Sequence, residues 1–303
     1  MLHFLPAPLK GVLSFGLYAL NTICLTLPLI FLSLFKFILP FPPIIVILDK
    51  ILIAIATLWV SINSLNADLF CNIDWDIRGL ERLKKKEWYL VMSNHQSWVD
   101  ILVLQKTLNR KIPMLKFFLK KELIWVPFLG LAWWALDFPF MKRYSKKELA
   151  QKPHLKGKDL ESTKKACERF KHTPISIMNF VEGTRFTPQK KKAQKAPFNH
   201  LLKPKAGGVA FVIGSMGDCL HKIIDVTIVY PGKTPSFWEF VSGRTRKIII
   251  TFEVMEMGPA LQGDYFNDVE YKAFFCEWLN SLWIKKDARI QGLRDGDPLD
   301  NGA

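Results

Sequence analysis

The sequence predicts an α/β fold with a mostly parallel or mixed sheet covered by helices, preceded by an N-terminal membrane helical hairpin. Three observations support this prediction. Residues 11–35 form a run of 25 positions without a charged side chain. From residue 71 onward, short apolar runs rich in β-branched and aromatic residues alternate with segments of helical periodicity. This alternation is typical of a sheet that is covered by helices on both faces.

The first predicted element is a long helix at residues 11–35. As a helix, this stretch would measure about 37 Å, enough to cross a hydrocarbon core of about 30 Å with some tilt. A secretory signal peptide is the competing interpretation, but the stretch is too long and lacks both a basic start and an obvious cleavage site. The prolines at 40, 42 and 43 then end the helix.

A second apolar stretch follows at residues 44–65, interrupted early by Asp49 and Lys50. A full span would need this charged pair near an interface or paired inside the protein. A hairpin that lies only partly in the membrane fits the pattern equally well. The chain is accordingly divided into a membrane-embedded segment at 1–66, a globular domain at 67–290 and a polar C-terminal tail at 291–303.

The globular domain is predicted to alternate strands and helices. Its first strand, at 73–77, alternates apolar and polar residues, whereas the next, at 88–93, is continuously apolar and therefore buried. Further strands are predicted at 111–115, 135–140, 175–181, 223–230 and 247–255. Helices are predicted at 98–108, 116–134 (broken by Pro127), 160–171, 208–216 and 268–285.

The composition is that of a folded chain with an excess of basic residues. Hydrophobic residues make up 50% of the 303 positions, which is too apolar for disorder. The net charge of +15 resides mostly beyond residue 66 and favours a cytoplasmic position for the globular domain. Five widely spaced cysteines without a Cys-x-x-Cys pair favour reduced thiols in a cytosol-facing compartment, without zinc. They are Cys24, Cys71, Cys167, Cys219 and Cys276.

A polar turn, Asn-His-Gln-Ser-Trp-Val-Asp at 94–100, joins the buried strand to the next helix. Open α/β sheets bind ligands at the carboxyl ends of their strands, where this turn would lie. Five residues on one helix correspond to a rotation of about 140°, so His95 and Asp100 can meet only across the turn. Asp100 could then orient the imidazole and leave its other nitrogen free as a general base. Alternatively, Ser97 and Asp100 form a capping box at the helix start. Spacing alone leaves both interpretations open.

A second candidate site, Glu-Gly-Thr-Arg at 182–185, follows the predicted strand at 175–181. Glycine permits a sharp turn or the close approach of a ligand, and the planar fork of arginine suits phosphate. An ordinary surface turn with an ion pair is the alternative. Other catalytic patterns are missing, because the sequence contains neither a Gly-x-Ser-x-Gly elbow nor a His-Glu-x-x-His metal motif.

Two of these segments closely resemble sequence blocks of the glycerophospholipid acyltransferase superfamily, whose members acylate glycerol-3-phosphate or lysophospholipids. His95 and Asp100 match the His-x4-Asp signature of its first block, and Phe-Val-Glu-Gly-Thr-Arg at 180–185 matches its third. The resemblance favours a catalytic role for the turn over capping alone.

Two further segments resemble the remaining blocks, in the expected order. Trp-Ala-Leu-Asp-Phe-Pro-Phe-Met-Lys-Arg at 134–143 is similar to the second block, without its usual Gly-x-Ile-Phe opening. Val-Thr-Ile-Val-Tyr-Pro at 226–231 is similar to the fourth, with a tyrosine before the final proline. The resemblance covers residues 73–230, and its second block is most similar to lysocardiolipin-type acyltransferases and their bacterial inner-membrane relatives.

The resemblance implies an acyltransferase of the cell inner membrane whose catalytic domain faces the cytoplasm. His95 would deprotonate the hydroxyl of a lysophospholipid, and Asp100 would orient it and stabilise its imidazolium. The co-substrate would be the thioester of acyl-CoA or acyl carrier protein, and no cofactor or metal is expected. The substrate-binding residues implied are Glu182, Gly183, Thr184, Arg185 and Arg143.

The resemblance favours 1-acyl-sn-glycerol-3-phosphate as the acceptor, with lysophosphatidylglycerol or lysocardiolipin as alternatives. A thioesterase or lipase and a basic membrane-surface binding module are the other functions left open. Basic clusters at 142–158, 190–195 and 203–205 are usually solvated faces, and no nucleic-acid-binding module is recognisable. Beside an apolar N-terminus they favour contact with anionic lipid headgroups, and an acidic acyl carrier protein could use the same clusters.

Overall fold

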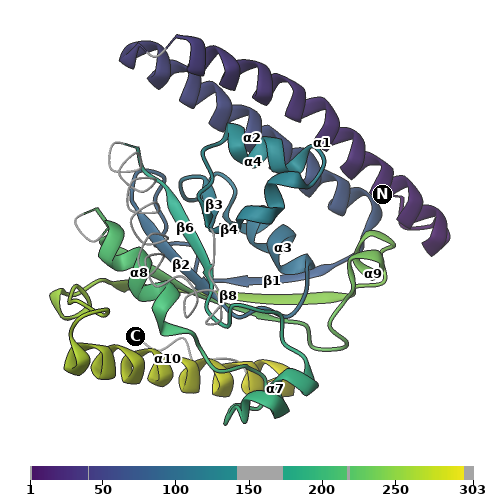
Figure 1. The fold of residues 1–303 in the computed structure, drawn as a ribbon. Helices are drawn as coiled ribbons and strands as arrows, with labels where there is room; N and C mark the ends of the chain where they lie inside the picture. The colour runs from purple at the N-terminus through teal and green to yellow at the C-terminus, as the bar shows by residue number, and fades with distance from the viewer. Residues whose placement is uncertain (1, 40, 142–172, 217–218, 297–303) are drawn as a thin grey trace.

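The computed structural model describes residues 2–39, 41–141, 173–216 and 219–296. A mixed six-stranded sheet, in the order β1-β8-β7-β2-β6-β3, carries helices on both faces and follows a long N-terminal helical hairpin (Figure 1). This arrangement confirms the predicted fold class. The strands are β1 (Asp74–Arg78), β2 (Tyr89–Ser93), β3 (Leu115–Phe117), β4 (Leu119–Lys120), β5 (Phe140–Met141), β6 (Ser176–Phe180), β7 (Lys222–Val229) and β8 (Lys247–Glu256). The helices are α1 (Ala7–Ile38), α2 (Pro42–Phe70), α3 (Val99–Leu108), η1 (Lys121–Trp125), α4 (Leu129–Ala135), α7 (Pro188–Gln194), α8 (Ala206–Met216), α9 (Phe237–Val241), η4 (Pro259–Leu261) and α10 (Val269–Asp295).

The strands of the main sheet do not all run in one direction. β2 lies parallel to β6 and β7, and β6 lies parallel to β3, whereas β8 runs antiparallel to β7 and parallel to β1. β2 lies near the centre because Tyr-Leu-Val-Met-Ser suits burial on both faces, and all of its residues are buried. The carboxyl ends of β2, β6 and β7 therefore meet at one edge of the sheet, where open α/β folds bind ligands.

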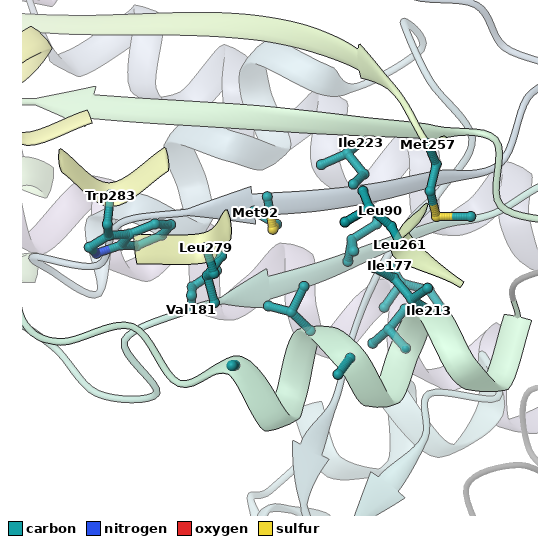
Figure 2. Close-up of a cluster of buried hydrophobic side chains, with 14 of the residues drawn as sticks. Leu90, Met92, Ile177, Val181, Ile213, Ile223, Met257, Leu261, Leu279 and Trp283 are labelled. Atoms are coloured by element: carbon teal, nitrogen blue, oxygen red, sulfur yellow. The ribbon is translucent and has the colours of Figure 1, made fainter. Parts of the chain in front are cut away.

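Alternate residues of β2 face two separate hydrophobic cores, as the period of two in a strand requires. Leu90 and Met92 belong to the core on the side of α8 and α10, where Trp283 of α10 is fully buried (Figure 2). Tyr89 and Val91 belong to the opposite core, which includes residues of α3 and α9. The two cores hold the sheet between its helical layers, so the loops at its carboxyl edge start from fixed positions.

A buried ion pair joins α10 to the sheet. Lys286 of α10 is fully buried, and its Nζ lies 2.7 Å from Oδ1 of Asp225 on β7. The same Nζ donates to the carbonyl of Val226 at 2.6 Å, and the guanidinium of Arg289 lies 3.4 Å from the other oxygen of Asp225. Burial lowers the pKa of Lys286, and the carboxylate of Asp225 opposes that shift. The charged form of Lys286 therefore depends on Asp225.

Polar contacts join the hairpin helices α1 and α2 within largely apolar surfaces. The hydroxyl of Tyr18 donates to the carbonyl of Asn63 at 3.2 Å, and the amide of Asn21 donates to the side chain of Asn63 at 2.8 Å. Hydrogen bonds of this kind hold helices together in lipid, where apolar side chains gain little from meeting each other. Asp49, one of the charges that interrupt the second apolar stretch, pairs with Lys36 of α1 at 2.7 Å.

The hairpin lies along the α/β domain instead of projecting from it. In the first half of α1, the ring of Phe15 lies 6.3 Å from the ring of Phe237 on α9. Near the other end, Lys36 lies 2.5 Å from Asp137, which follows α4. Both helices pass over the side of the sheet that carries α3 and α4 (Figure 1). By length and composition, both are also able to cross a membrane.

The segment between α3 and β6 differs most from the prediction. In the structure it contains β3, β4, η1, α4 and β5. Pairing of β3 with β6 removes the start of the predicted helix. Pro127 disfavours helical geometry at the residue before it, and Phe128 adopts a φ of 60°, so α4 begins only after both. The helix predicted at 116–134 with a break at Pro127 is reduced to η1 and α4, which lie on either side of that proline. The strands predicted at 111–115 and 135–140 are wrong over most of their length, because only their last residues fall in β3 and β5.

Several predicted boundaries also shift. α10 continues to Asp295 and buries Leu293, so the polar tail expected from residue 291 is helical over its first five residues. The hairpin continues to Phe70, beyond the expected boundary at residue 66. The short helices α7 and α9 are not among the predicted elements. All of these differences extend or add helix without changing the sheet.

Candidate active site

His95 follows β2 directly, and Asp100 lies in the first turn of α3. Nδ1 of His95 is 2.8 Å from Oδ2 of Asp100. The carboxylate is fully buried, whereas 12% of the histidine side chain remains exposed. A carboxylate at Nδ1 favours the tautomer with the proton on that nitrogen, which leaves the lone pair of Nε2 available. His95 and Asp100 therefore contact each other across the turn, as their spacing in the sequence requires.

Asp100 also binds the backbone of the turn. Its Oδ2 accepts from the N–H groups of Gln96 at 2.6 Å and Ser97 at 2.9 Å, and its Oδ1 accepts from the hydroxyl of Tyr230 at 2.6 Å. The hydroxyl of Ser97 accepts from the N–H of Val99 at 3.2 Å and donates to the carbonyl of Pro235 at 2.5 Å. Ser97 and Asp100 therefore cap the helix start through reciprocal contacts, as the alternative interpretation holds, while Asp100 also contacts His95.

Tyr230 acts as a neutral donor to this carboxylate. Burial raises its pKa well above the ordinary value, and the nearby charge of Asp100 raises it further. Its position follows β7, the strand beside β2. The tyrosine that departs from the pattern of the fourth block thus contacts the orienting aspartate.

Three side chains hold the turn around His95. The amide of Asn94 makes two hydrogen bonds of 2.9 Å, one to the N–H and one to the carbonyl of Ile228. Gln96 donates to the same carbonyl at 2.8 Å. The ring of Phe180 stacks on the imidazole, with centroids 3.8 Å apart and an interplanar angle of 14°. The histidine is therefore held in one orientation, as a positioned general base requires.

Glu182 supports the site from behind. Its side chain is fully buried, and its oxygens accept from the backbone N–H groups of His95 at 3.2 Å and Leu202 at 3.1 Å. Burial raises its pKa to about 8, although both N–H donors act in the opposite direction. The sequence predicts that Glu182 contacts substrate. The structure instead shows Glu182 tying the turn that carries His95 to the segment before α8, because both of its oxygens are engaged inside the protein.

Gly183 and Thr184 form the exposed bend after β6. Gly183 has a φ of 66°, which side chains disfavour, and a Cβ there would lie 3.0 Å from Nζ of Lys205. The Nζ of Lys190 donates to the hydroxyl of Thr184 at 2.7 Å and to the carbonyl of Arg185 at 2.9 Å. The cationic side chains of Lys190 and Lys205 therefore lie beside the bend, and Lys190 fixes its backbone.

Arg185 lies at the outer side of the same turn. Its Cζ is 4.9 Å from the ring centroid of Trp98, the residue before α3. The next residue, Phe186, donates its N–H to the carbonyl of His95 at 2.7 Å. A cation–π contact holds the guanidinium by its face and leaves its N–H groups available to an anion. The structure thus brings Gly183, Arg185 and the histidine–aspartate pair to one sheet edge.

Some predicted features lie outside the described residues, namely Arg143, Cys167 and the helix at 160–171. Within the described parts of the chain, no cluster of His, Cys, Asp or Glu could hold a metal ion. The cysteines in those parts are free thiols.

Sequence reasoning missed the supporting residues of the site. Phe180 and Tyr230 end or follow predicted strands at the carboxyl edge, and that position is a signal that could have identified them. Lys190 and Lys205 lie within basic clusters whose usual explanation is a solvated face. Trp98 carries no signal of its own, because its contact with arginine depends on how two loops meet.

Fold and site define a class: α/β proteins with an apolar helical hairpin and a buried aspartate that orients a histidine at the sheet edge. The sequence profile of the family described as Acyltransferase matches residues 74–231, which is more than half of the chain. The chain belongs to this acyltransferase family.

Alignments with curated relatives cover most of this chain, and these relatives are longer than this chain. It is 26% identical over 236 residues to 1-acyl-sn-glycerol-3-phosphate acyltransferase 3 of Arabidopsis thaliana, covering 73% of this chain and 57% of that protein. It is also 26% identical over 264 residues to 2-acyl-1-lysophosphatidylinositol acyltransferase of Saccharomyces cerevisiae. That alignment covers 71% of this chain and 63% of the yeast protein. The crystal structure of the 1-acyl-sn-glycerophosphate acyltransferase PlsC from Thermotoga maritima aligns with 91% of this chain and 98% of that chain, at 16% identity and a TM-score of 0.46.

Proposed function

We propose that this protein is a membrane-attached acyltransferase that moves a fatty acyl chain from an acyl thioester to the free hydroxyl of a lysophospholipid. The observation that carries the proposal is the 2.8 Å contact between His95 and the buried Asp100. The favoured acceptor is 1-acyl-sn-glycerol-3-phosphate, the compound that appears in the name of the plant relative. Lysophosphatidylglycerol or lysocardiolipin is the alternative acceptor, since the yeast relative is named for another lysophospholipid.

In the proposed reaction, Nε2 of His95 takes the proton of the acceptor hydroxyl as its oxygen attacks the thioester carbonyl. The carbon–sulfur bond then breaks, and the departing thiolate takes the proton from the imidazolium. Asp100 stabilises that imidazolium and keeps the ring oriented. The acceptor hydroxyl is the nucleophile, so no acyl-enzyme forms, and the thioester of acyl-CoA or acyl carrier protein is a co-substrate instead of a cofactor.

The cations around Gly183 are proposed to bind the phosphate of the acceptor. Arg185 offers paired N–H groups, and Lys205 lies against the glycine, where a Cβ would be 3.0 Å from its Nζ. Lys190 is already bound to the loop and acts as its anchor. By the family resemblance, Arg143 adds a second phosphate contact.

The function is tested by measuring thiol release from acyl-CoA, and from acyl carrier protein, with a panel of lysophospholipids. Release should depend on the acceptor and match the phospholipid formed mole for mole. A thioesterase would release thiol without any acceptor, and a binding module would release none. Either outcome would exclude the acyltransferase reaction.

In the same assay, Arg185→Lys should raise the KM for the acceptor about tenfold or more, because an ammonium cannot reproduce the paired contacts of a guanidinium. The KM for the thioester should change little. Lys192→Gln removes an exposed charge from α7 and serves as the control. Unchanged acceptor kinetics in Arg185→Lys would place this arginine outside the phosphate site.

We propose that the hairpin holds the protein in the inner membrane, with the basic domain in the cytoplasm. Its outward face is strongly apolar, with Phe31, Val46 and Leu65 among its exposed side chains. Apolar surface on this scale marks membrane or protein contacts. Because the domain contacts α1 at both halves, the outward face is the one left for lipid, as in a hairpin that lies partly in the membrane.

The protein should therefore remain in the membrane fraction after washing with high salt or carbonate. Exposed charges are screened within about 3 Å at 1 M salt, so electrostatic adsorption alone would not survive the wash. Recovery of most of the protein in the supernatant would contradict insertion of the hairpin. A variant that keeps α1 and α2 but has glutamine in place of the three lysines at 190–192 should sediment in the same way.

A further inference from the structure

The buried carboxylate of Asp100 uses its two oxygens differently. Oδ2 accepts from the backbone N–H groups of Gln96 and Ser97 and contacts Nδ1 of His95. Oδ1 accepts from the hydroxyl of Tyr230 at 2.6 Å, and among the described residues this hydroxyl is its one donor. The carboxylate is fully buried, so water does not reach it to replace a lost donor. Tyr230 therefore supplies the hydrogen bond on which one of the two oxygens depends.

Packing fixes the hydroxyl of Tyr230 in this position. Tyr230 follows β7 directly and precedes Pro231, which restricts the backbone of the residue before it. Its side chain is buried in the core that also contains Val99 of α3 and Phe240 of α9. The ring cannot turn away without opening the core between these helices and the sheet, so the hydroxyl stays directed at Asp100.

A neutral donor at Asp100 changes how strongly that carboxylate holds a charged partner. Burial and the nearby charge of Asp100 raise the pKa of Tyr230 well above its ordinary value, so the hydroxyl keeps its proton and donates. A hydrogen bond donated to a carboxylate stabilises its negative charge. A charge that is already stabilised in this way attracts the imidazolium of His95 less strongly. The hydroxyl of Tyr230 therefore disfavours protonation of His95, and removal of the hydroxyl would favour it.

Other charged groups lie on the elements around this pair, and none of them changes when the hydroxyl of Tyr230 is removed. They include Glu182, Arg185, Lys190 and Lys205 after β6, Asp225 on β7, Lys233 and Glu239 after β7, Lys106 on α3 and Lys286 on α10. Burial raises the pKa of Glu182 to about 8, and this carboxyl interacts electrostatically with both Lys286 and Asp100. Its titration is therefore a background that is common to every variant of Tyr230.

We propose that Tyr230 is a positioning residue that acts through Asp100 and keeps His95 unprotonated, and so able to accept a proton, at lower pH than an apolar side chain would. The inference rests on the proposed function, in which a neutral His95 takes the proton of the acceptor hydroxyl. The tyrosine is also the point at which this chain departs from the fourth sequence block that it resembles. The adjustment therefore distinguishes this chain from relatives without a tyrosine at that place.

The pH dependence of kcat/KM tests this role in the full-length protein. Tyr230→Phe keeps the ring and removes the hydroxyl, so the acidic limb of the profile should move about one pH unit higher. The acceptor KM on the plateau should not change. Replacing Tyr230 with 3-fluorotyrosine, whose hydroxyl is the stronger donor, should move the limb in the opposite direction. This second variant keeps every hydrogen bond, so it decides the question even if Tyr230→Phe fails to fold.

Tyr89→Phe is the matched control. Tyr89 is also buried, and its hydroxyl donates to a carboxylate, that of Glu87 at 2.8 Å, at the opposite end of β2 from His95. Its loss should leave the acidic limb in place. If Tyr230 only stabilises the fold, Tyr230→Phe would likewise lower the thermal midpoint and leave the limb where it is. That result would overturn the inference.

A second readout does not depend on turnover. In protein labelled with ¹⁵N-histidine, the ring signals follow protonation by NMR, and His95→Ala identifies the signal of His95. In Tyr230→Phe this signal should titrate about one pH unit higher than in the unmodified protein, and in Tyr89→Phe it should not move. An unchanged titration would overturn the role of Tyr230 whatever the activity. A shifted titration without acceptor-dependent thiol release would support that role and exclude the proposed function instead.

Discussion

Replacing Asp225 with asparagine is expected to lower the free energy of unfolding by about 3 to 5 kcal/mol, the usual cost of removing one partner from a buried ion pair. Lys286 is fully buried, and its other hydrogen-bond acceptors are neutral, namely the carbonyl of Val226 and the hydroxyl of Thr227. Its Nζ also lies 5.3 Å from the ring centroid of Trp283. Burial already lowers the pKa of this lysine, so without the carboxylate it must lose its proton or remain as an isolated charge. Thermal unfolding in detergent should show a midpoint about 10 °C lower.

A second substitution separates the ion pair from other effects on β7. Asp225→Asn combined with Lys286→Met should recover most of the loss, because a buried pair can be replaced by apolar groups of similar size at little cost. Glu256→Gln is the matched surface control. Its carboxylate is 75% exposed and lies 3.7 Å from Lys222, so its loss should change stability by less than about 1 kcal/mol. A midpoint for Asp225→Asn equal to that of Glu256→Gln would mean that Lys286 is neutral in the folded protein.

The central strands could be predicted from the sequence because their own residues specify them. The continuous apolar run of β2 and the long β-branched runs of β7 and β8 suit burial whatever their neighbours are. β3 is different, because its three residues become a strand only by pairing with the edge of β6. The positive φ of Phe128 is likewise set by packing and leaves no periodic signal. Elements that depend on distant partners were therefore the ones predicted wrongly.

The same distinction applies to the site. Five residues of spacing leave His95 and Asp100 one way to meet, so the contact could be predicted from local geometry. The role of Glu182 depends on the backbone of Leu202, twenty residues further along the chain, and no local pattern indicates that contact. A polar residue in a matched motif suggests substrate binding, and only its burial shows that it supports the turn instead.

The largest effect on activity is expected from His95→Ala, which should lower turnover by about 10² to 10⁴ or more, the usual contribution of a positioned general base. The variant removes the ring that stacks on Phe180 and the only acceptor nitrogen proposed for the hydroxyl proton. The acceptor KM should change less than turnover, because the phosphate contacts proposed for Arg185 remain. Initial rates at saturating thioester, with the acceptor varied, separate the two parameters.

Asp100→Asn distinguishes orientation of the histidine from support of the helix start. Asparagine can keep its oxygen on the N–H groups of Gln96 and Ser97 and place its amide at the hydroxyl of Tyr230, so the folded turn should persist. It loses the charge that stabilises the imidazolium, so turnover should still fall by about 10² or more. Because Asp100 acts through His95, the double variant should be little slower than His95→Ala alone.

If Asp100 only supports the helix, Asp100→Asn would be almost fully active, while Asp100→Ala would lose about 1 kcal/mol or more of stability. Turnover and thermal midpoint measured on the same preparations decide between these outcomes, and an active Asp100→Asn protein would end the case for a catalytic pair.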